Sequence, residues 1–580
     1  MTTEPPALPS FWERHFRSCA AVVLLCMATA QLVGVLRDSQ TGDESYHIVN
    51  GYVFLKTRVR PPISEHPPVA QAISALPLLP LDLRMPPPAG PAYGYFDQAR
   101  DFLYRNRYPA DTILRLARLP KVLVSLLIGL MVAWWMRPRF GERAALAALT
   151  LYCFDPNFLA HGHYATTDVP ATLFFVAACL AWSRFLTDGT MRSAAASGLA
   201  VGAALATKYS ALLLLPIFVC LYGIRFLQQI GAGPGPLRWN PIHLVKSLMV
   251  VVVVALVVVF AAFGFETGKV MPPETAAALQ ADGFQRVGGT PFDRAASTLT
   301  VPAPSFFGGL TLLALHDLRG HRSYLMGQYS QAGWWYYFPV VMAVKTPTGA
   351  LLLLLLALAT ATWAILRNGP RQACRSLGGL SPDWCVLFFP PVIYLAVCIE
   401  SRICLGIRHL LPFYPLLYMW IAAVLFSRRI AIPVFPRRAA ALCLALVVLE
   451  SVSVFPRYLG FFNLPSGGPS QGYKWLVDSN LDWGQDLKRL KSYLVDRRIS
   501  NVCLNYFGTA VPEYYGIVSR PVPASLDEAR ASGCVVAMSV TALYEFQPFD
   551  GRYAWMQRTP PSDRVGDSFL VFDPRRIAVR

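Results

Sequence analysis

Charged residues are scarce in this sequence. They make up 15% of the 580 residues, whereas hydrophobic residues make up 54%. A soluble domain carries about 25% charged residues, so the composition excludes an ordinary soluble protein and predicts a membrane protein. The net charge of +18 does not indicate a nucleic-acid-binding protein, because the basic residues gather in short loops between apolar segments.

Several local signatures are missing as well. The sequence has no CxxC pair, no Cys/His spacing typical of a metal site, and no repeat of fixed period. Most of the twelve cysteines lie inside apolar segments, where we expect small buried side chains. Cys503 and Cys534 lie instead in a polar C-terminal part. They form a disulfide if that part is extracytoplasmic, and a pair of reduced structural thiols is an equally good interpretation.

What the sequence has in abundance is long apolar runs. A helix needs about 20 apolar residues to cross the hydrocarbon core of a bilayer. About eleven segments meet or approach that length, so the sequence predicts an α-helical polytopic membrane protein. The predicted spans are 18–37, 113–136, 144–160, 169–187, 194–207, 209–228, 246–265, 347–366, 384–400, 409–427 and 438–455.

Basic residues predict the orientation of these spans. Arg137, Arg139 and Arg184 belong to a set that occupies alternate short loops, and the positive-inside rule makes those loops cytoplasmic. The N-terminus is then cytoplasmic, and the long loops 38–112 and 266–346 lie outside. We therefore predict a multi-pass protein of the cytoplasmic (inner) membrane.

The character of the chain changes near residue 456. Charge rises and the long apolar runs stop, which predicts a membrane domain over 1–455 and a small α/β domain over 456–580. An odd number of spans makes that C-terminal domain extracytoplasmic. Three acids in it recur every four residues, which favours a solvated helical face or a cap, and secondarily an acceptor-binding surface. They are Asp478, Asp482 and Asp486.

Ionisable residues gather at the edges of the predicted outer loops. Such residues are costly at membrane depth and are functional by default. The set combines acids with bases, as a transfer from a lipid-anchored phosphate requires: a carboxylate takes a proton from an acceptor hydroxyl, and cations stabilise the departing phosphate. Its members are Asp43, Glu44, Glu65, His66, Asp168, Lys208, Lys345 and Arg408.

Motifs around these residues occur in a characteristic order. They are "DESYH…GY…EHPPV", "ATTDVPATLFF", "ATKYSALLLLP", "YYFPVVMAVKTP" and "GIRHLLPFYP". Together they resemble the dolichyl-phosphate-mannose protein O-mannosyltransferases and their bacterial relatives in the glycosyltransferase C superfamily, over roughly residues 15–455. The lipid A aminoarabinose transferases are more distant relatives.

The resemblance implies a glycosyltransferase C fold, a polyprenyl-phosphate-linked sugar donor and inversion at the anomeric carbon. It implies a catalytic carboxylate in the first outer loop, for which Asp43 is the best match, with Glu44 beside it. Asp168 matches a second acidic site of the family. By the same resemblance, candidates for contact with the lipid phosphate are Lys208, Lys345 and Arg408.

Each candidate residue also has a structural alternative, and Asp43 and Glu44 are suited to capping a helix or to a solvated loop. Glu65 and His66 stand before two prolines and form either a hydrogen-bonded turn or an acceptor contact, with metal binding ranked lower. Asp168 precedes a helix start and is suited to capping as well as to function. The candidate cations could extend along the membrane surface to lipid headgroups. This alternative is weakest for Arg408, which begins an apolar helix on the predicted outer side.

The sequence therefore predicts an inverting glycosyltransferase. It would move mannose or a related sugar from a polyprenyl-phosphate carrier to a hydroxyl of a protein, lipid or glycan on the outer face of the membrane. No cofactor is predicted, because fixed cations can hold a leaving phosphate, and a divalent metal stays open as an alternative. The rival predictions are a transporter or flippase of a lipid-linked or small anionic substrate, and a non-catalytic scaffold. The expected partners are donor, acceptor and membrane lipid, and not nucleic acid.

Overall fold

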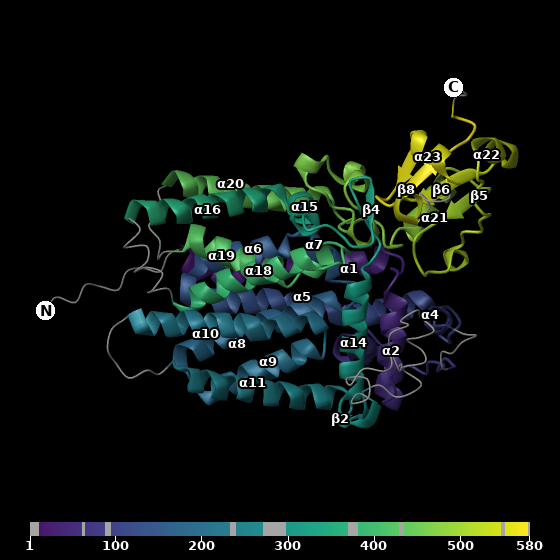
Figure 1. The fold of residues 1–580 in the computed structure, drawn as a ribbon. Coiled ribbons are helices and arrows are strands. Elements are labelled where there is room, and N and C mark those ends of the chain that lie inside the picture. Colours follow the sequence, from purple (N-terminus) through teal and green to yellow (C-terminus); the bar gives the residue numbers. More distant parts are fainter. Residues whose placement is uncertain are drawn as a thin grey trace.

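Long helices packed side by side form the larger part of the molecule (Figure 1). The computed structural model describes residues 11–60, 64–87, 94–231, 239–270, 297–368, 381–427, 434–546 and 551–577. Within these ranges, seven helical segments are long and apolar enough to cross a membrane. They are α1 (Phe11–Arg37), α5 (Ala110–Phe140), α8 (Asp168–Asp188), η2 with α10 (Tyr209–Leu213 and Leu214–Gly231), α11 (Pro241–Ala262), α16 (Thr348–Asn368) and α18 (Pro382–Glu400).

The remaining predicted spans are helical too, but shorter or more charged. The predicted span 144–160 is divided between α6 and α7, because the chain turns at Asp155 before Pro156, and Asp155 accepts a hydrogen bond from the backbone N–H of Asn157. All eleven predicted segments thus coincide with helices, and the chain is a multi-pass membrane protein. These helices are α6 (Glu142–Cys153), α7 (Pro156–His161), α9 (Met191–Leu205), α19 (Phe413–Phe426) and α20 (Val434–Ser453).

Shorter elements of the two long loops gather at one end of the helix bundle. Figure 1 shows α2 and α14 crossing that end, on the same side as the C-terminal sheet. Residues 271–296, within the predicted outer loop 266–346, lie outside the described part. The loop elements are α2 (Glu44–Thr57), α3 (Pro68–Ala75), η1 (Leu76–Leu78), α4 (Tyr95–Tyr104), β1 (Thr267–Lys269), β2 (Thr300–Pro302), α14 (Pro304–Arg319), β3 (Ser323–Leu325), β4 (Gln328–Ser330) and α15 (Tyr337–Lys345).

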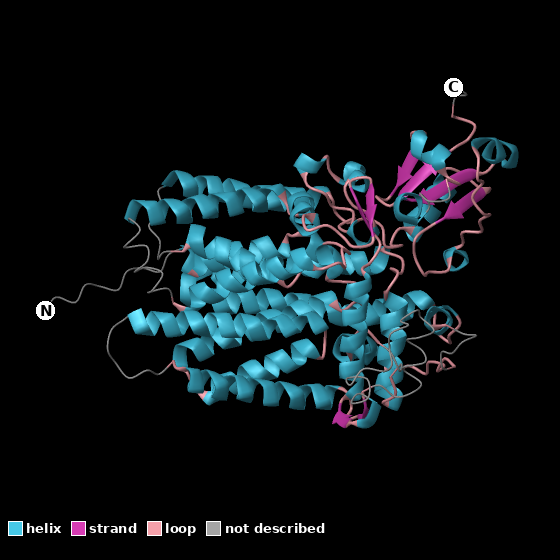
Figure 2. Ribbon diagram, viewed as in Figure 1, coloured by secondary structure: helices cyan, strands magenta, loops and turns pink. Residues whose placement is uncertain are grey.

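The C-terminal part forms a four-stranded sheet with short helices, as predicted (Figure 2). The strand order is β5-β6-β8-β7, with β5 parallel to β6 and the other pairs antiparallel. A disulfide joins Cys503 to Cys534, which decides between the two interpretations of this pair. The elements are α21 (Leu487–Asp496), β5 (Val502–Asn505), η7 (Pro512–Tyr515), α22 (Leu526–Ser532), β6 (Val535–Ser539), η8 (Ala542–Phe546), α23 (Ala554–Arg558), β7 (Asp563–Val565) and β8 (Phe569–Phe572).

An irregular segment connects α20 to this sheet and passes the end of the bundle. It contains only short 3-10 turns between residues 454 and 486. Polar side chains in it are nonetheless buried, among them Asn463, Asn480 and Asp482. Buried polar groups require hydrogen-bond partners, and here those partners belong to distant parts of the chain. The turns are η4 (Leu464–Ser466), η5 (Pro469–Lys474) and η6 (Asp478–Asn480).

Candidate active site

Four of the predicted site residues meet where helices begin or end at one end of the bundle. Asp43 is the residue before α2, and Asp168 is the first residue of α8. Lys208 lies in the extended turn between α9 and η2. Arg408 lies in η3 (Ile407–Leu410), just before α19. All four residues lie at or near helix ends on the same side of the bundle. Residues that are distant in sequence therefore come together there.

These four residues form two ion pairs. Nη1 of Arg408 lies 2.9 Å from Oδ2 of Asp43, and Nζ of Lys208 lies 2.6 Å from Oδ1 of Asp168. Burial lowers the pKa of Arg408, but attraction from the carboxylates of Asp43, Asp168 and Asp478 outweighs burial and raises that pKa above its usual value. Because Arg408 interacts with Asp168 as well as with Asp43, the two ion pairs are neighbours. The guanidinium of Arg408 therefore interacts with three carboxylates.

The acids differ in how far they can be reached. The side chain of Asp43 is 38% exposed, whereas that of Asp168 is 3% exposed. Both cations retain some exposure, 14% for Arg408 and 20% for Lys208. A substrate can thus approach the carboxylate of Asp43 and the two cations, while Asp168 stays beneath and balances the charge of Lys208.

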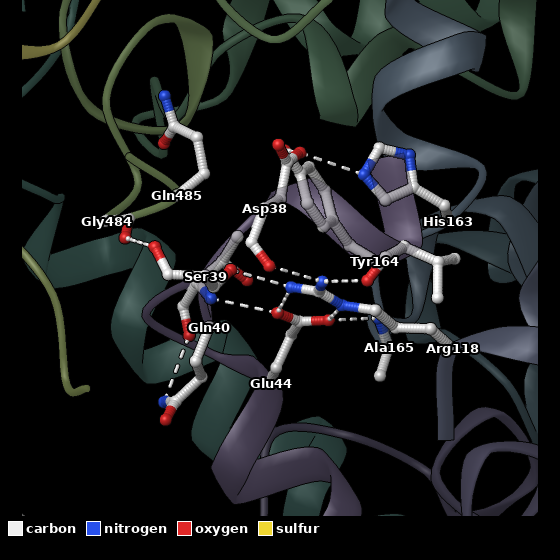
Figure 3. A network of polar contacts seen from close by, with 12 residues as sticks. Asp38, Ser39, Gln40, Glu44, Arg118, His163, Tyr164, Ala165, Gly484 and Gln485 are labelled. Carbon is white, nitrogen blue, oxygen red and sulfur yellow. Dashed lines mark hydrogen bonds and ion pairs between the residues drawn. The ribbon is translucent and has the colours of Figure 1, made fainter. Parts of the chain in front are cut away.

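Glu44 has entirely different surroundings from its neighbour Asp43. Its carboxylate is fully buried and accepts two hydrogen bonds from Arg118, Nε at 2.8 Å and Nη2 at 2.6 Å (Figure 3). The backbone N–H groups of Thr41 and Ala165 donate to the same two oxygens. Its acceptor positions are thereby occupied within the protein. The contacts of Glu44 favour a role in holding residues 38–44 in place, and not in proton transfer.

Asp38, Arg118 and Arg489 complete this buried network and were not singled out from the sequence. Asp38 accepts from Arg489 Nη2 at 2.7 Å and lies 3.0 Å from Nε2 of His163. Electrostatic attraction from Arg489 and contact with His163 hold the pKa of Asp38 well below its usual range, against the effect of burial. One signal was available: Arg118 is a charged residue inside the predicted span 113–136, where charges are costly.

Glu65 and His66 lie between α2 and α3, and each has a histidine beside it. Oε1 of Glu65 is 2.9 Å from Nδ1 of His316, and Nε2 of His316 is 3.1 Å from Nδ1 of His321. The hydrogen bond to Glu65 raises the pKa of His316. The His66 ring lies 4.8 Å from the His47 ring. Among the residues that the structure describes, no group of three or more His, Cys, Asp or Glu side chains is arranged to hold a metal ion.

Lys345 takes no part in the two ion pairs. It is 1% exposed, and its Nζ donates to the backbone carbonyls of Leu459, Phe461 and Asn480 at 3.0, 2.6 and 2.7 Å. An ammonium group has three N–H donors, so all of them are engaged. Through these contacts Lys345 holds the irregular segment after α20 in place. No donor of the ammonium group is left for a lipid phosphate.

Replacing Lys345 with Met should therefore lower stability and leave lipid binding intact. Three buried carbonyl groups would lose a donor, and an unsatisfied buried polar group costs about 1–3 kcal/mol. We expect a clear fall in the melting temperature of the detergent-solubilised protein. Lys56→Met is the matched control, since Lys56 makes one exposed contact with a carbonyl. Weaker binding of a polyprenyl phosphate at unchanged stability would instead assign Lys345 to the phosphate.

Of the two structural alternatives predicted for Asp478, Asp482 and Asp486, the solvated helical face is wrong. Asp486 does occupy the cap position before α21, but its side chain makes no capping hydrogen bond. Asp482 is fully buried and accepts a hydrogen bond from the backbone N–H of Thr541, and Asp486 is 2% exposed and bonded to Arg489 and Ser568. Helix α21 begins only at Leu487. The four-residue spacing of these acids arises in irregular structure, where tertiary partners satisfy the carboxylates of Asp482 and Asp486.

One part of the chain matches a known protein family. Residues 113–262 match the sequence model of the dolichyl-phosphate-mannose-protein mannosyltransferases. Over these residues the match bears out the resemblance that the motifs indicate, and it contains Asp168 and Lys208. No curated protein matches the chain by sequence.

Several solved structures are similar to the whole chain or to parts of it at low identity. ArnT from Cupriavidus metallidurans is 14% identical, with 97% of each chain covered and a TM-score of 0.43. The oligosaccharyltransferase AglB from Archaeoglobus fulgidus is 12% identical, with 92% of this chain and 70% of that chain covered and a TM-score of 0.45. The Pmt1–Pmt2 complex of S. cerevisiae is 19% identical over 43% of this chain and 32% of that chain, with a TM-score of 0.31.

Proposed function

We propose that this protein is an inverting glycosyltransferase that uses a polyprenyl-phosphate-linked sugar. The observation that carries the proposal is the pairing of a reachable carboxylate, Asp43, with Arg408, beside a second pair formed by Asp168 and Lys208. The family match over residues 113–262 supports glycosyl transfer. The apolar helices around the site provide a surface for a lipid tail.

In this proposal Asp43 is the base. Its carboxylate takes the proton of an acceptor hydroxyl while the hydroxyl oxygen forms a bond to the anomeric carbon. The bond between that carbon and the phosphate oxygen breaks on the opposite face, which inverts the configuration. The lipid phosphate leaves with the electron pair, and Arg408 and Lys208 stabilise its added negative charge. No nucleotide takes part in the step.

Donor binding and base activation are coupled in this arrangement. Arg408 is paired with Asp43. A phosphate that binds Arg408 competes for the same guanidinium and weakens its bond to Asp43. The carboxylate is then released to contact the acceptor hydroxyl once the donor is in place. Asp168 keeps Lys208 oriented through a partly buried contact and does not need to move.

The same proposal places the site on the outer face of a cytoplasmic (inner) membrane. The N-terminus is cytoplasmic, residues 1–455 form the membrane domain, and residues 456–580 form an extracytoplasmic domain. Two features support this orientation. Alternate short loops carry clusters of arginine, and the C-terminal sheet contains a disulfide, which persists in oxidising compartments.

The disulfide gives a direct test of that orientation. If residues 456–580 are extracytoplasmic, Cys503 and Cys534 should be oxidised in cells. Cells would be denatured in an alkylating reagent, and the alkylation of these two residues would be read by mass spectrometry before and after reduction. Labelling without reductant would contradict the extracytoplasmic location. Chain-entropy arithmetic for a separation of 31 residues predicts that a Cys503→Ser/Cys534→Ser variant loses about 3–4 kcal/mol of stability.

A transfer assay with the purified protein tests the function itself. The protein in detergent would receive polyprenyl-phosphate-linked mannose, glucose or arabinose with radiolabelled sugar, together with total membrane extract. Label moving to a protein, lipid or glycan fraction would establish transfer and identify both sugar and acceptor. A folded protein that moves no label from any of these donors would favour the transporter or flippase, because transport needs two compartments and detergent removes them.

A further inference from the structure

A short segment of the C-terminal part, residues 478–483, lies against the loop that carries Arg408. Oδ1 of Asn480 accepts a hydrogen bond from the backbone N–H of Ile407 at 3.0 Å. The hydroxyl of Ser479 donates to the carbonyl of Leu405 at 2.9 Å. Asn480 also donates to the carbonyl of Val477, so its amide is fixed at both ends. The 478–483 segment thus holds the backbone on the N-terminal side of Arg408.

The close fit requires a glycine on the loop. Gly406 has φ +103°, in the left-handed region that favours glycine, and a Cβ there would lie 2.3 Å from Oδ1 of Asn480. Any larger residue would separate the loop from Asn480. The two segments are therefore shaped for each other immediately beside Arg408.

Trp483 contacts Arg408 and also Gly42, the residue before Asp43. Its ring lies beneath the guanidinium of Arg408, 4.7 Å from Cζ to the ring centroid. Its backbone carbonyl accepts a hydrogen bond from the N–H of Gly42 at 2.9 Å, directly before Asp43. The ring is 1% exposed and also packs near His161. One residue therefore supports the guanidinium of Arg408 and the backbone just before Asp43.

Asp478 adds a carboxylate to the same surroundings. It lies in η6 with φ +55°, a conformation rare for residues other than glycine, and it is partly exposed. Its carboxylate is attracted by Arg408 and repelled by the carboxylates of Asp43 and Glu545. A strained backbone that brings a partly exposed acid toward a site is typical of functional segments.

We propose that residues 478–483 belong to the transfer site, where Asn480 and Trp483 are positioning residues that hold Arg408 for the donor phosphate. This inference rests on the proposed function. The indole face keeps the planar guanidinium in place when the phosphate draws it away from Asp43, since Arg stacks on aromatic rings without losing its hydrogen-bond donors. The C-terminal part is then a component of the site and not only a cover for it.

A double-mutant cycle tests the inference on the full-length protein. Binding of a radiolabelled polyprenyl monophosphate in detergent would be measured for wild type, Arg408→Ala, Trp483→Leu and the double variant. We expect Trp483→Leu to weaken binding about 5- to 30-fold, the range between an exposed and a desolvated cation–π contact. We expect the same substitution to have almost no effect in the Arg408→Ala background, because non-additivity reveals interacting residues.

Controls separate positioning from folding. Trp475→Leu removes another tryptophan of the same part, whose Nε1 bonds to the carbonyl of Ser466, and should leave lipid-phosphate binding unchanged. Ser479→Ala removes a single hydrogen bond to Leu405 and serves if Trp483→Leu does not fold. It should weaken binding by a smaller factor that also disappears with Arg408→Ala.

The outcomes distinguish this inference from the proposed function. Equal effects of Trp483→Leu in both backgrounds, or no effect on binding, would overturn the positioning role while leaving the phosphate on Arg408. No loss of binding in Arg408→Ala itself would overturn the phosphate assignment of the proposed function, and the inference with it. Loss in Arg408→Ala together with a background-dependent loss in Trp483→Leu would establish both.

Discussion

Replacement of Asp43 with Asn should reduce sugar transfer by about 10³-fold or more, within the range that a general base contributes. The carboxamide has the shape of the carboxylate but does not accept a proton at neutral pH. Binding of the lipid phosphate should persist or become tighter, because the neutral carboxamide would no longer compete with the phosphate for Arg408. Transfer of labelled sugar and binding of polyprenyl phosphate would be measured on the same preparation.

The opposite changes in transfer and binding make this prediction specific. A folding defect would reduce both, and the control Asp97→Asn, which loses an exposed contact with Arg100 on α4, should change neither. Transfer by Asp43→Asn within tenfold of wild type would contradict the role of Asp43 as base. In that case Glu65 would be the next residue to test, since its carboxylate is 33% exposed.

Replacement of Arg118 with Met should be the most damaging change for stability. Arg118 and Glu44 are both fully buried, and removing one partner of a buried pair costs about 3–5 kcal/mol, because the other charge stays without compensation. Arg118 also donates to the carbonyls of Asp38 and Ser39. We expect a large fall in melting temperature, or failure to purify a folded protein.

Two further variants test whether the unpaired buried charge of Glu44 causes the loss of stability. Arg105→Met removes an exposed arginine that contacts Asp101 four residues earlier, and should cost less than about 1 kcal/mol. The double variant Glu44→Gln/Arg118→Met should recover part of the lost stability, because no unpaired buried charge remains. A double variant as unstable as the sum of the single ones would show that the two residues act independently.

The apolar spans and the polar residues between them could be predicted from the sequence, because each depends on local composition. All eleven predicted spans are helical, and Asp43, Asp168, Lys208 and Arg408 were among the expected site residues. Their partners could not be predicted. Asp43 and Arg408 are 365 residues apart, and no local pattern records which of several acids a given cation will meet.

The C-terminal acids and Lys345 show a second limit. A spacing of four residues in Asp478, Asp482 and Asp486 is compatible with a helix, but Gly484 adopts φ +91° and the segment stays irregular. Lys345 has the residue type of a phosphate ligand and binds backbone carbonyls instead. Residue type describes the chemistry that a side chain can perform, whereas the number of its internal partners decides whether that chemistry is available to a substrate.

The position of Trp483 beneath Arg408 and beside Gly42 has a consequence for biosynthesis. The ribosome completes Asp43 and the first helix long before the C-terminal part, so a nascent chain holds the carboxylate without its support. The candidate site is complete only after α20 is in place and the C-terminal part packs against the bundle. Under the proposed function, an unfinished or truncated chain would hold Arg408 without Trp483 beneath it, and would bind the donor phosphate more weakly than the complete chain.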